Sequence, residues 1–250
     1  MRILSHLKDS KKIANQKYAF AFLFSLIFIF TKLQVSAQDK NEGVSYKERK
    51  NVVMKEQISI LKTGALLVRL KTKSNSVNAL MEIGDTTGAK NIIEKQNQFN
   101  KNIITAFRNY YKFSPVYFFT SNFSDTIRKH KLHEVIFVND ELKPDPAIKP
   151  TPQGFLIAEF GNVTQDTASY LSGTYLTQTD EGLKRDESYY GGTDTKIQAF
   201  VIMSDQFVQL CDPFPYYSRV RKTNPKQKDL DKSVKRMNEN FFNYYKVNNK

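Results

Sequence analysis

Three short apolar runs, each long enough for one buried β-strand, occur in the first half of the chain with helical patterns between them. The runs lie at residues 65–70, 116–120 and 135–139. Between the first two, residues 89–112 place apolar side chains and the polar Gln96 on one stripe at helical spacing. A second helix is expected at 124–131. The order strand, helix, strand, helix, strand predicts a parallel sheet with right-handed crossovers and helices on both faces.

The second half of the chain departs from this alternation. Residues 143–152 contain four of the eight prolines and predict an extended connector before a fourth strand at 155–160. Residues 197–203 and 207–210 flank a Ser-Asp-Gln turn and predict an antiparallel hairpin, and 226–246 predict a C-terminal helix. The expected fold class is therefore α/β, with a mixed, mainly parallel sheet, helices on both faces, a closing antiparallel hairpin and a C-terminal helix.

Residues 1–37 have the three parts of a cleavable secretory signal peptide. Polar and basic residues precede a thirteen-residue apolar run at 18–30, and Val35-Ser36-Ala37 provides the small residues that signal peptidase accepts. A membrane-spanning helix needs about 20 apolar residues, which is more than this run provides. A retained N-terminal membrane anchor is therefore the alternative hypothesis rather than the main one. The pattern predicts export by the Sec route to the periplasm or the extracellular space.

The mature chain that remains after removal of the leader has two expected parts. Residues 38–51 are charged and predict a flexible N-terminal arm, followed by a single α/β domain at 52–250. The leader contains six Lys or Arg residues and one Asp, so the net charge falls from +13 to +8 without it. A weak contact with an anionic membrane surface is compatible with this charge. Nucleic acid is not an expected partner, because the chain is predicted to be exported and has no nucleic-acid-binding motif.

Two resemblances follow from these residues. The junction of Val35-Ser36-Ala37 with Gln38 resembles signal peptides of Bacteroidota, and the mature chain resembles exported α/β proteins of that phylum, a resemblance that implies no activity. The closing hairpin and helix resemble the second half of thioredoxin-like folds in topology. No Cys-x-x-Cys follows the first strand, so this second resemblance implies no redox chemistry.

The single cysteine and two neighbouring histidines are candidates for a catalytic or metal site. Cys211 can form no internal disulfide, and catalysis by its thiolate would need a histidine as base; the alternative interpretation is a small buried hydrophobe. His130 and His133 could share a helix face, but a closed zinc site needs four ligands, and the neighbouring cations Arg128, Lys129 and Lys131 oppose the binding of a divalent ion. We therefore expect a solvated helix end, with no metal and no cofactor.

A carboxylate cluster, Asp140, Glu141 and Asp145, follows the third predicted strand. Open α/β sheets bind ligands at this end, so these groups could act as a general base, although such residues more often form turns. The sequence has no glycine-rich phosphate loop, no Gly-x-Ser-x-Gly and no His-Glu-x-x-His. A periplasmic hydrolase-type α/β enzyme that uses these Asp residues and the histidines is the alternative functional hypothesis.

Two aromatic segments are the candidate binding surface. One contains two tyrosines before a pair of glycines, and the other contains two tyrosines after a Pro-Phe-Pro sequence with two arginines beyond it. The candidate binding residues are Tyr189, Tyr190, Tyr216, Tyr217, Arg219 and Arg221. Exposed tyrosines beside arginines suit a peptide or glycan ligand, and the alternative is that both segments cover the core. The expected function is a non-catalytic binding or accessory module of the cell envelope, whose partner is an envelope protein, a peptide or a glycan.

Overall fold

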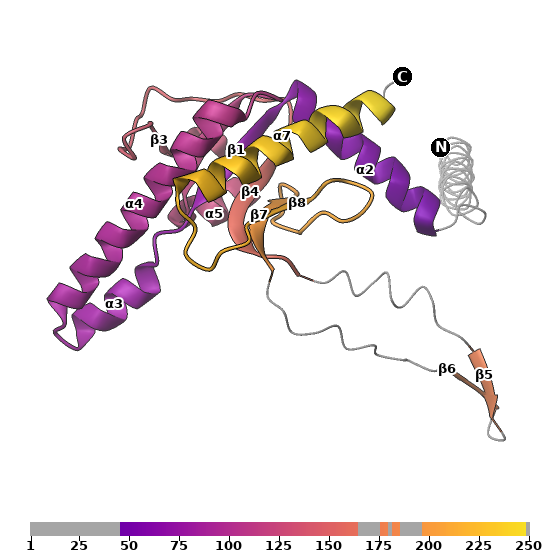
Figure 1. Ribbon diagram of the computed structural model, residues 1–250, viewed down its shortest axis with the longest axis horizontal. Helices are drawn as coiled ribbons and strands as arrows, with labels where there is room; N and C mark the ends of the chain where they lie inside the picture. The colour runs from indigo at the N-terminus through magenta and orange to yellow at the C-terminus, as the bar shows by residue number, and fades with distance from the viewer. Residues whose placement is uncertain (1–45, 165–175, 180–181, 186–196, 249–250) are drawn as a thin grey trace, which may run out of the picture. The chain divides into compact units, whose positions relative to one another are not determined.

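The computed structural model describes residues 46–164, 176–179, 182–185 and 197–248 (Figure 1). Lys50–Lys250 form one compact unit. The helices are α2 (Tyr46–Thr63), α3 (Ser74–Glu82), α4 (Thr86–Tyr110), α5 (Ser124–Arg128) and α7 (Gln227–Asn248), with 3-10 turns η1 (Ser121–Phe123) and η2 (Leu132–Glu134). The strands are β1 (Ala65–Leu70), β2 (Val116–Thr120), β3 (Phe137–Val138), β4 (Phe155–Asn162), β5 (Leu176–Thr179), β6 (Gly182–Arg185), β7 (Gln198–Met203) and β8 (Tyr217–Arg219).

Six of the strands form one mixed sheet in the order β3-β2-β1-β4-β7-β8, and β5 pairs with β6 in a separate antiparallel hairpin. The central strand β1 runs parallel to β2 and to β4, whereas β3, β7 and β8 add antiparallel pairings at the edges. Every residue of β1 except Arg69 is buried, which explains its continuous apolar sequence. The predicted fold class is confirmed.

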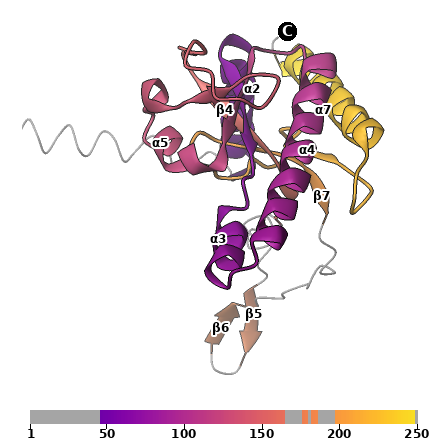
Figure 2. The same ribbon diagram turned by 90° about the vertical axis from the view of Figure 1, so that its left-hand side faces the viewer.

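Helices cover both faces of the sheet. On one face, α2, α4 and α7 pack on the sheet around Phe107, Phe200 and Phe241. On the other face, Ile127 of α5 packs with Phe119 and with the apolar residues that precede β3. Figure 2 shows α4 and α7 on one side of the strands and α5 on the other. The largest fully buried side chains of the core are phenylalanines.

The prediction for the second strand of the closing hairpin is wrong. Residues 207–210 form only an isolated bridge, between Met203 and Gln209, whereas residues 199–201 of β7 pair with β8. Phe207 has a φ of 60°, in the left-handed region, and this conformation interrupts an extended strand directly after the turn. The chain therefore needs residues 211–216 to return before the edge strand begins.

Two further boundaries differ from the sequence predictions. α2 begins at Tyr46, inside the stretch predicted to be a flexible arm, and residues 38–45 lie outside the described residues. The third strand is only Phe137–Val138, because the side chain of Asn139 accepts hydrogen bonds from the N–H groups of Glu141 and Lys143 and so starts a turn.

The predicted leader, residues 1–37, lies outside the part of the chain that the structure describes. Of the helices that are described, none combines the length and the apolar character needed to cross a membrane.

Candidate functional site

A cleft of about 500 Å³ opens at the carboxyl ends of the parallel strands β1 and β4. The strand order reverses at this point, since β2 lies on one side of β1 and β4 on the other, and open α/β sheets bind their ligands at such a position. We call it the basic cleft. It is lined by Arg69, Lys71, Lys73, Lys95, Gln96, Phe99, Asn100, Ile103, Phe160, Gly161, Asn162, Gln198, Thr223, Asn224 and Pro225.

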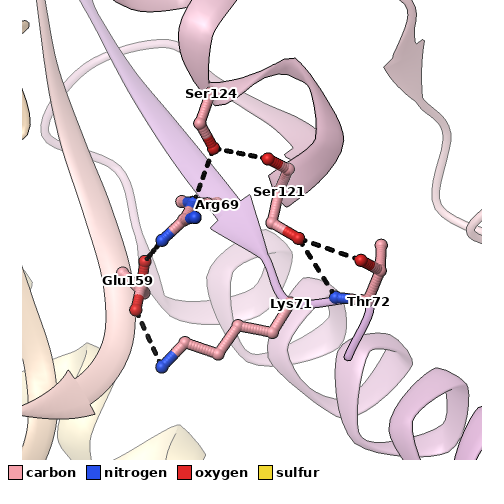
Figure 3. Close-up of polar contacts among 6 residues, drawn as sticks. All are labelled: Arg69, Lys71, Thr72, Ser121, Ser124 and Glu159. Carbon is pink, nitrogen blue, oxygen red and sulfur yellow. Dashed lines mark hydrogen bonds and ion pairs between the residues drawn. The ribbon is translucent and has the colours of Figure 1, made fainter. Parts of the chain in front are cut away.

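Four cations and no carboxylate line the basic cleft, as far as the described residues show. Arg69 and Lys71 share one counterion, the carboxylate of Glu159 on β4. Lys71 Nζ lies 2.8 Å from Glu159 Oε1, and Arg69 Nη1 donates to Glu159 Oε2 (Figure 3). Lys73 and Lys95 form no ion pair with any acidic residue that the structure describes. The cleft therefore has a surplus of positive charge, which favours an anion.

Two buried polar residues of α4 hold the end of β1 in place. Asn100 Nδ2 donates to the main-chain carbonyl of Lys71 over 2.9 Å, and Asn100 Oδ1 accepts from Gln96 Nε2 over 3.0 Å. Both side chains are buried, so these hydrogen bonds satisfy groups that water does not reach. Gln96 interrupts the apolar stripe of α4 because it faces this polar edge of the sheet rather than the core.

Arg69 is anchored from three directions. In addition to the Glu159 carboxylate, its Nε donates to Ser124 Oγ over 2.8 Å, and its guanidinium carbon lies 5.6 Å from the centre of the Phe207 ring. Ser124 in turn donates to the carbonyl oxygen of Ser121, whose Oγ accepts from the N–H of Thr72 (Figure 3). Arg69 is therefore a fixed part of the wall, and the lysines are the more adaptable cations.

A second hollow, of about 340 Å³, adjoins the basic cleft and shares Asn162, Gln198 and Thr223 with it. Its other lining residues are Ile197, Arg219, Val220, Arg221 and Lys222, again with no acidic residue among those described. Gln198 Oε1 is buried and has no hydrogen-bond partner among the residues that the structure describes. We call this the arginine hollow.

The predicted binding residues do not form one surface in the described part of the structure. Tyr189 and Tyr190 lie outside the described residues. Tyr216 packs against the main core, and Tyr217 on β8 is 37 % exposed. Their ring centres are 4.9 Å apart, but neither ring lines the basic cleft or the arginine hollow.

Of the described residues of the predicted surface, only Arg219 and Arg221 line one of these two hollows. The alternative interpretation, in which the aromatic segment covers the core, describes Phe214, which is fully buried, and Tyr216. Exposed Tyr217 fits the binding interpretation better than its neighbour does.

The predicted catalytic candidates have separate partners. His130 Nε2 lies 3.2 Å from Asp205 Oδ2 and 3.1 Å from Gln206 Nε2, while His133 is 80 % exposed. Asp140 pairs with Arg108 at 2.7 Å. In the described ranges, no three His, Cys, Asp or Glu side chains gather closely enough to hold a metal ion.

The remaining candidates have local roles. Asp145 Oδ1 accepts from the N–H of Ala147 within a turn, and Cys211 packs against the main core. A hydrogen bond from Lys131 lowers the pKa of the exposed Glu134 carboxyl next to His133.

Sequence reasoning missed the basic cleft, although two signals for it are present. Lys71 and Lys73 directly follow a strand that is apolar except for Arg69, at the end where α/β sheets bind ligands. Gln96 and Asn100 place amides on an otherwise apolar helix stripe. No family model, curated protein or solved structure matches the chain, so its function has to be argued from this chemistry.

Proposed function

We propose that this chain is an exported, non-catalytic binding module of the cell envelope, and that the basic cleft binds an anionic ligand. The observation that carries the proposal is the convergence of Lys71, Lys73 and Lys95 with Arg69 on a cleft without acidic lining residues in the described chain. Although the full chain has 25 acidic residues, the only one paired with these cations is Glu159 among those described.

Hydrogen bonds from these cations to an anion should contribute enough free energy to be measured. Charge-assisted hydrogen bonds contribute about 1.5–3 kcal/mol each, so the loss of even one of them should weaken binding by about tenfold or more. Lys73 and Lys95 are themselves exposed, so this contribution should weaken as salt is added.

The rest of the lining suits an organic anion better than a bare ion. Phe99 and Phe160, with ring centres 5.0 Å apart, form an apolar wall together with Ile103. Asn162 and Asn224 add amide groups that can both donate and accept hydrogen bonds. Apolar walls with a few polar groups are typical of small-molecule sites of this volume.

A non-catalytic role is favoured by what the lining residues can do. Proton transfer needs a carboxylate, an imidazole or a similar base within hydrogen-bond reach of the substrate. Thr223 has the only hydroxyl among the described lining residues, and none of these residues has a carboxylate, an imidazole or a thiol. The hydrolase alternative would use Asp140, Asp145 and the histidines. Asp140 pairs with Arg108, Asp145 accepts from the N–H of Ala147, and His130 lies beside Asp205, so these groups do not converge.

Calorimetric titration with glucose 6-phosphate, with glucose as the neutral control, tests the proposal. We expect binding of glucose 6-phosphate that weakens with added salt, no binding of glucose, and a loss of at least tenfold in the double variant Lys73→Ala/Lys95→Ala. The matched control is Lys90→Ala/Lys101→Ala, which removes the same charge from exposed positions of α4 outside the cleft. Equal losses in the two variants, or no binding of the anion at low salt, would overturn the proposal.

The export part of the proposal has its own test. N-terminal sequencing of the protein recovered from the periplasm or medium should begin at Gln38. A product that begins at residue 1 and sediments with membranes would support the anchored alternative instead.

A further inference from the structure

We infer that the ligand of the basic cleft is an acidic oligosaccharide that extends into the arginine hollow. This inference rests on the proposed function and specifies its ligand class. The two hollows meet at Asn162, Gln198 and Thr223, so a chain-like ligand can occupy both.

The charges are arranged for a ligand with more than one anionic group. Lys73 and Lys95 lie in the basic cleft, and Arg219 and Arg221 lie in the arginine hollow. None of these four side chains forms an ion pair with an acidic residue of the described chain, whereas Lys222 lies 3.7 Å from Asp229. A ligand with a single charge would use only one of the two groups of cations.

The residues shared by the two hollows are uncharged, and one of them has an acceptor that a donor on the ligand could satisfy. Gln198 Oε1 is a buried acceptor with no partner in the described part of the chain, and a buried unpaired acceptor costs free energy until a donor reaches it. A sugar hydroxyl can donate, whereas carboxylate, sulfate and phosphodiester oxygens only accept. The junction therefore favours a saccharide unit over the linkage of a polyphosphate.

The position of Gln198 is set by the sheet. Gln198 on β7 pairs with Asn162 on β4, and the main-chain carbonyl of Gln198 accepts from the N–H of Val220 over 2.8 Å. The backbone is thus held on both sides, and the side chain stays between the two hollows. In the basic cleft, the rings of Phe99 and Phe160 offer an apolar surface for the C–H face of a sugar ring.

The test compares oligomers with their monomers by calorimetry. The probes are hexagalacturonate and a heparin hexasaccharide, with galacturonic acid, maltohexaose and hexametaphosphate as comparisons. We expect one of the acidic hexasaccharides to bind at least tenfold more tightly than galacturonic acid, and maltohexaose not to bind. Hexametaphosphate should bind more weakly than that hexasaccharide.

Two variants localise the effect. Arg219→Ala/Arg221→Ala should weaken the hexasaccharide at least tenfold and leave galacturonic acid unchanged, while Lys228→Ala/Lys232→Ala on exposed positions of α7 is the charge-matched control. Gln198→Met, which removes the acceptor at similar size, should weaken the hexasaccharide but not hexametaphosphate. Circular dichroism melting checks that each variant is folded.

The outcomes separate this inference from the proposed function. If a monomeric anion binds through Lys73 and Lys95 but the arginine variant does not change hexasaccharide binding, the inference is overturned and the proposed function stands. Tighter binding of hexametaphosphate than of both hexasaccharides would also overturn it. If no anion binds in a way that depends on Lys73 and Lys95, the proposed function itself fails.

Discussion

The ammonium group of Lys71 and the carboxylate of Glu159 lie 2.8 Å apart at the adjacent carboxyl ends of β1 and β4. The same carboxylate pairs with Arg69, and its side chain is only 14 % exposed. Glu159 therefore neutralises part of the positive charge of the basic cleft, while it supplies the counterion that a partly buried Arg69 needs.

Replacement Glu159→Gln should separate these two roles. Loss of the negative charge should tighten the binding of glucose 6-phosphate by about 1 kcal/mol, or roughly fivefold, because the cleft then contains uncompensated cations. The same change should lower the free energy of unfolding by about 1–3 kcal/mol, because Arg69 loses its counterion. Calorimetry and urea unfolding measure the two effects, and weaker binding in this variant would contradict the role assigned to Glu159.

Asn100 should be essential to the shape of the cleft. In Asn100→Ala the carbonyl of Lys71 and the amide of Gln96 both lose a buried hydrogen-bond partner, so we expect a loss of about 1–3 kcal/mol in the free energy of unfolding. Anion binding should weaken as well, because the end of β1 is no longer tied to α4. Asn97→Ala, at an exposed position of the same helix, should change stability by less than about 0.5 kcal/mol. Equal effects of the two substitutions would show that the buried bonds do not position Lys71.

The adjacent tyrosines of the aromatic segment should differ in their contribution to stability. Tyr216 packs against the main core, so Tyr216→Ala should destabilise the fold by about 2 kcal/mol or more. Tyr217 is on the open side of β8, and Tyr217→Ala should leave the melting temperature nearly unchanged. Thermal unfolding of both variants is the measurement. A large loss in the second variant would mean that Tyr217 is part of the core.

Tyr111 should make the fold sensitive to high pH. Burial raises the pKa of its hydroxyl well above the ordinary value of about 10, despite the hydrogen bond with Ser114. The unfolded chain then loses the proton at a lower pH than the native state, so the free energy of unfolding is retained below about pH 10 and falls above it. Tyr111→Phe should reduce the slope of stability against pH between about 10 and 11 in urea unfolding. An unchanged slope would count against this assignment.

The central strands and long helices could be predicted from the sequence because their buried positions are occupied by apolar residues in a regular pattern. β1 and β2 have the predicted bounds, since a strand that is covered on both faces reads as an apolar run. The boundaries of α4 and α7 lie within about one turn of the predicted ones. The edge strand β8 has no apolar pattern, because the buried residue of Tyr-Ser-Arg is the central serine. This serine hydrogen-bonds with Ser233 of α7.

The basic cleft could not be assembled from the sequence for a similar reason. Lys71 directly follows β1, Asn162 and Gln198 lie on β4 and β7, and Lys95 lies on α4. The pairing of the three strands and the packing of α4 on the sheet bring them to one cleft. Arg219 and Arg221 were predicted as binding residues for their position next to tyrosines. The structure instead places them beside Gln198, in the arginine hollow.

A titration of ¹⁵N-labelled protein with glucose 6-phosphate, followed by NMR, tests the basic cleft most directly. The predicted result is a saturable change in the amide signals of residues 71–73, 95–100, 161–162 and 198, which Lys73→Ala/Lys95→Ala abolishes. Changes scattered over lysines throughout the surface, or the same changes in that variant, would contradict an anion-binding role for the cleft.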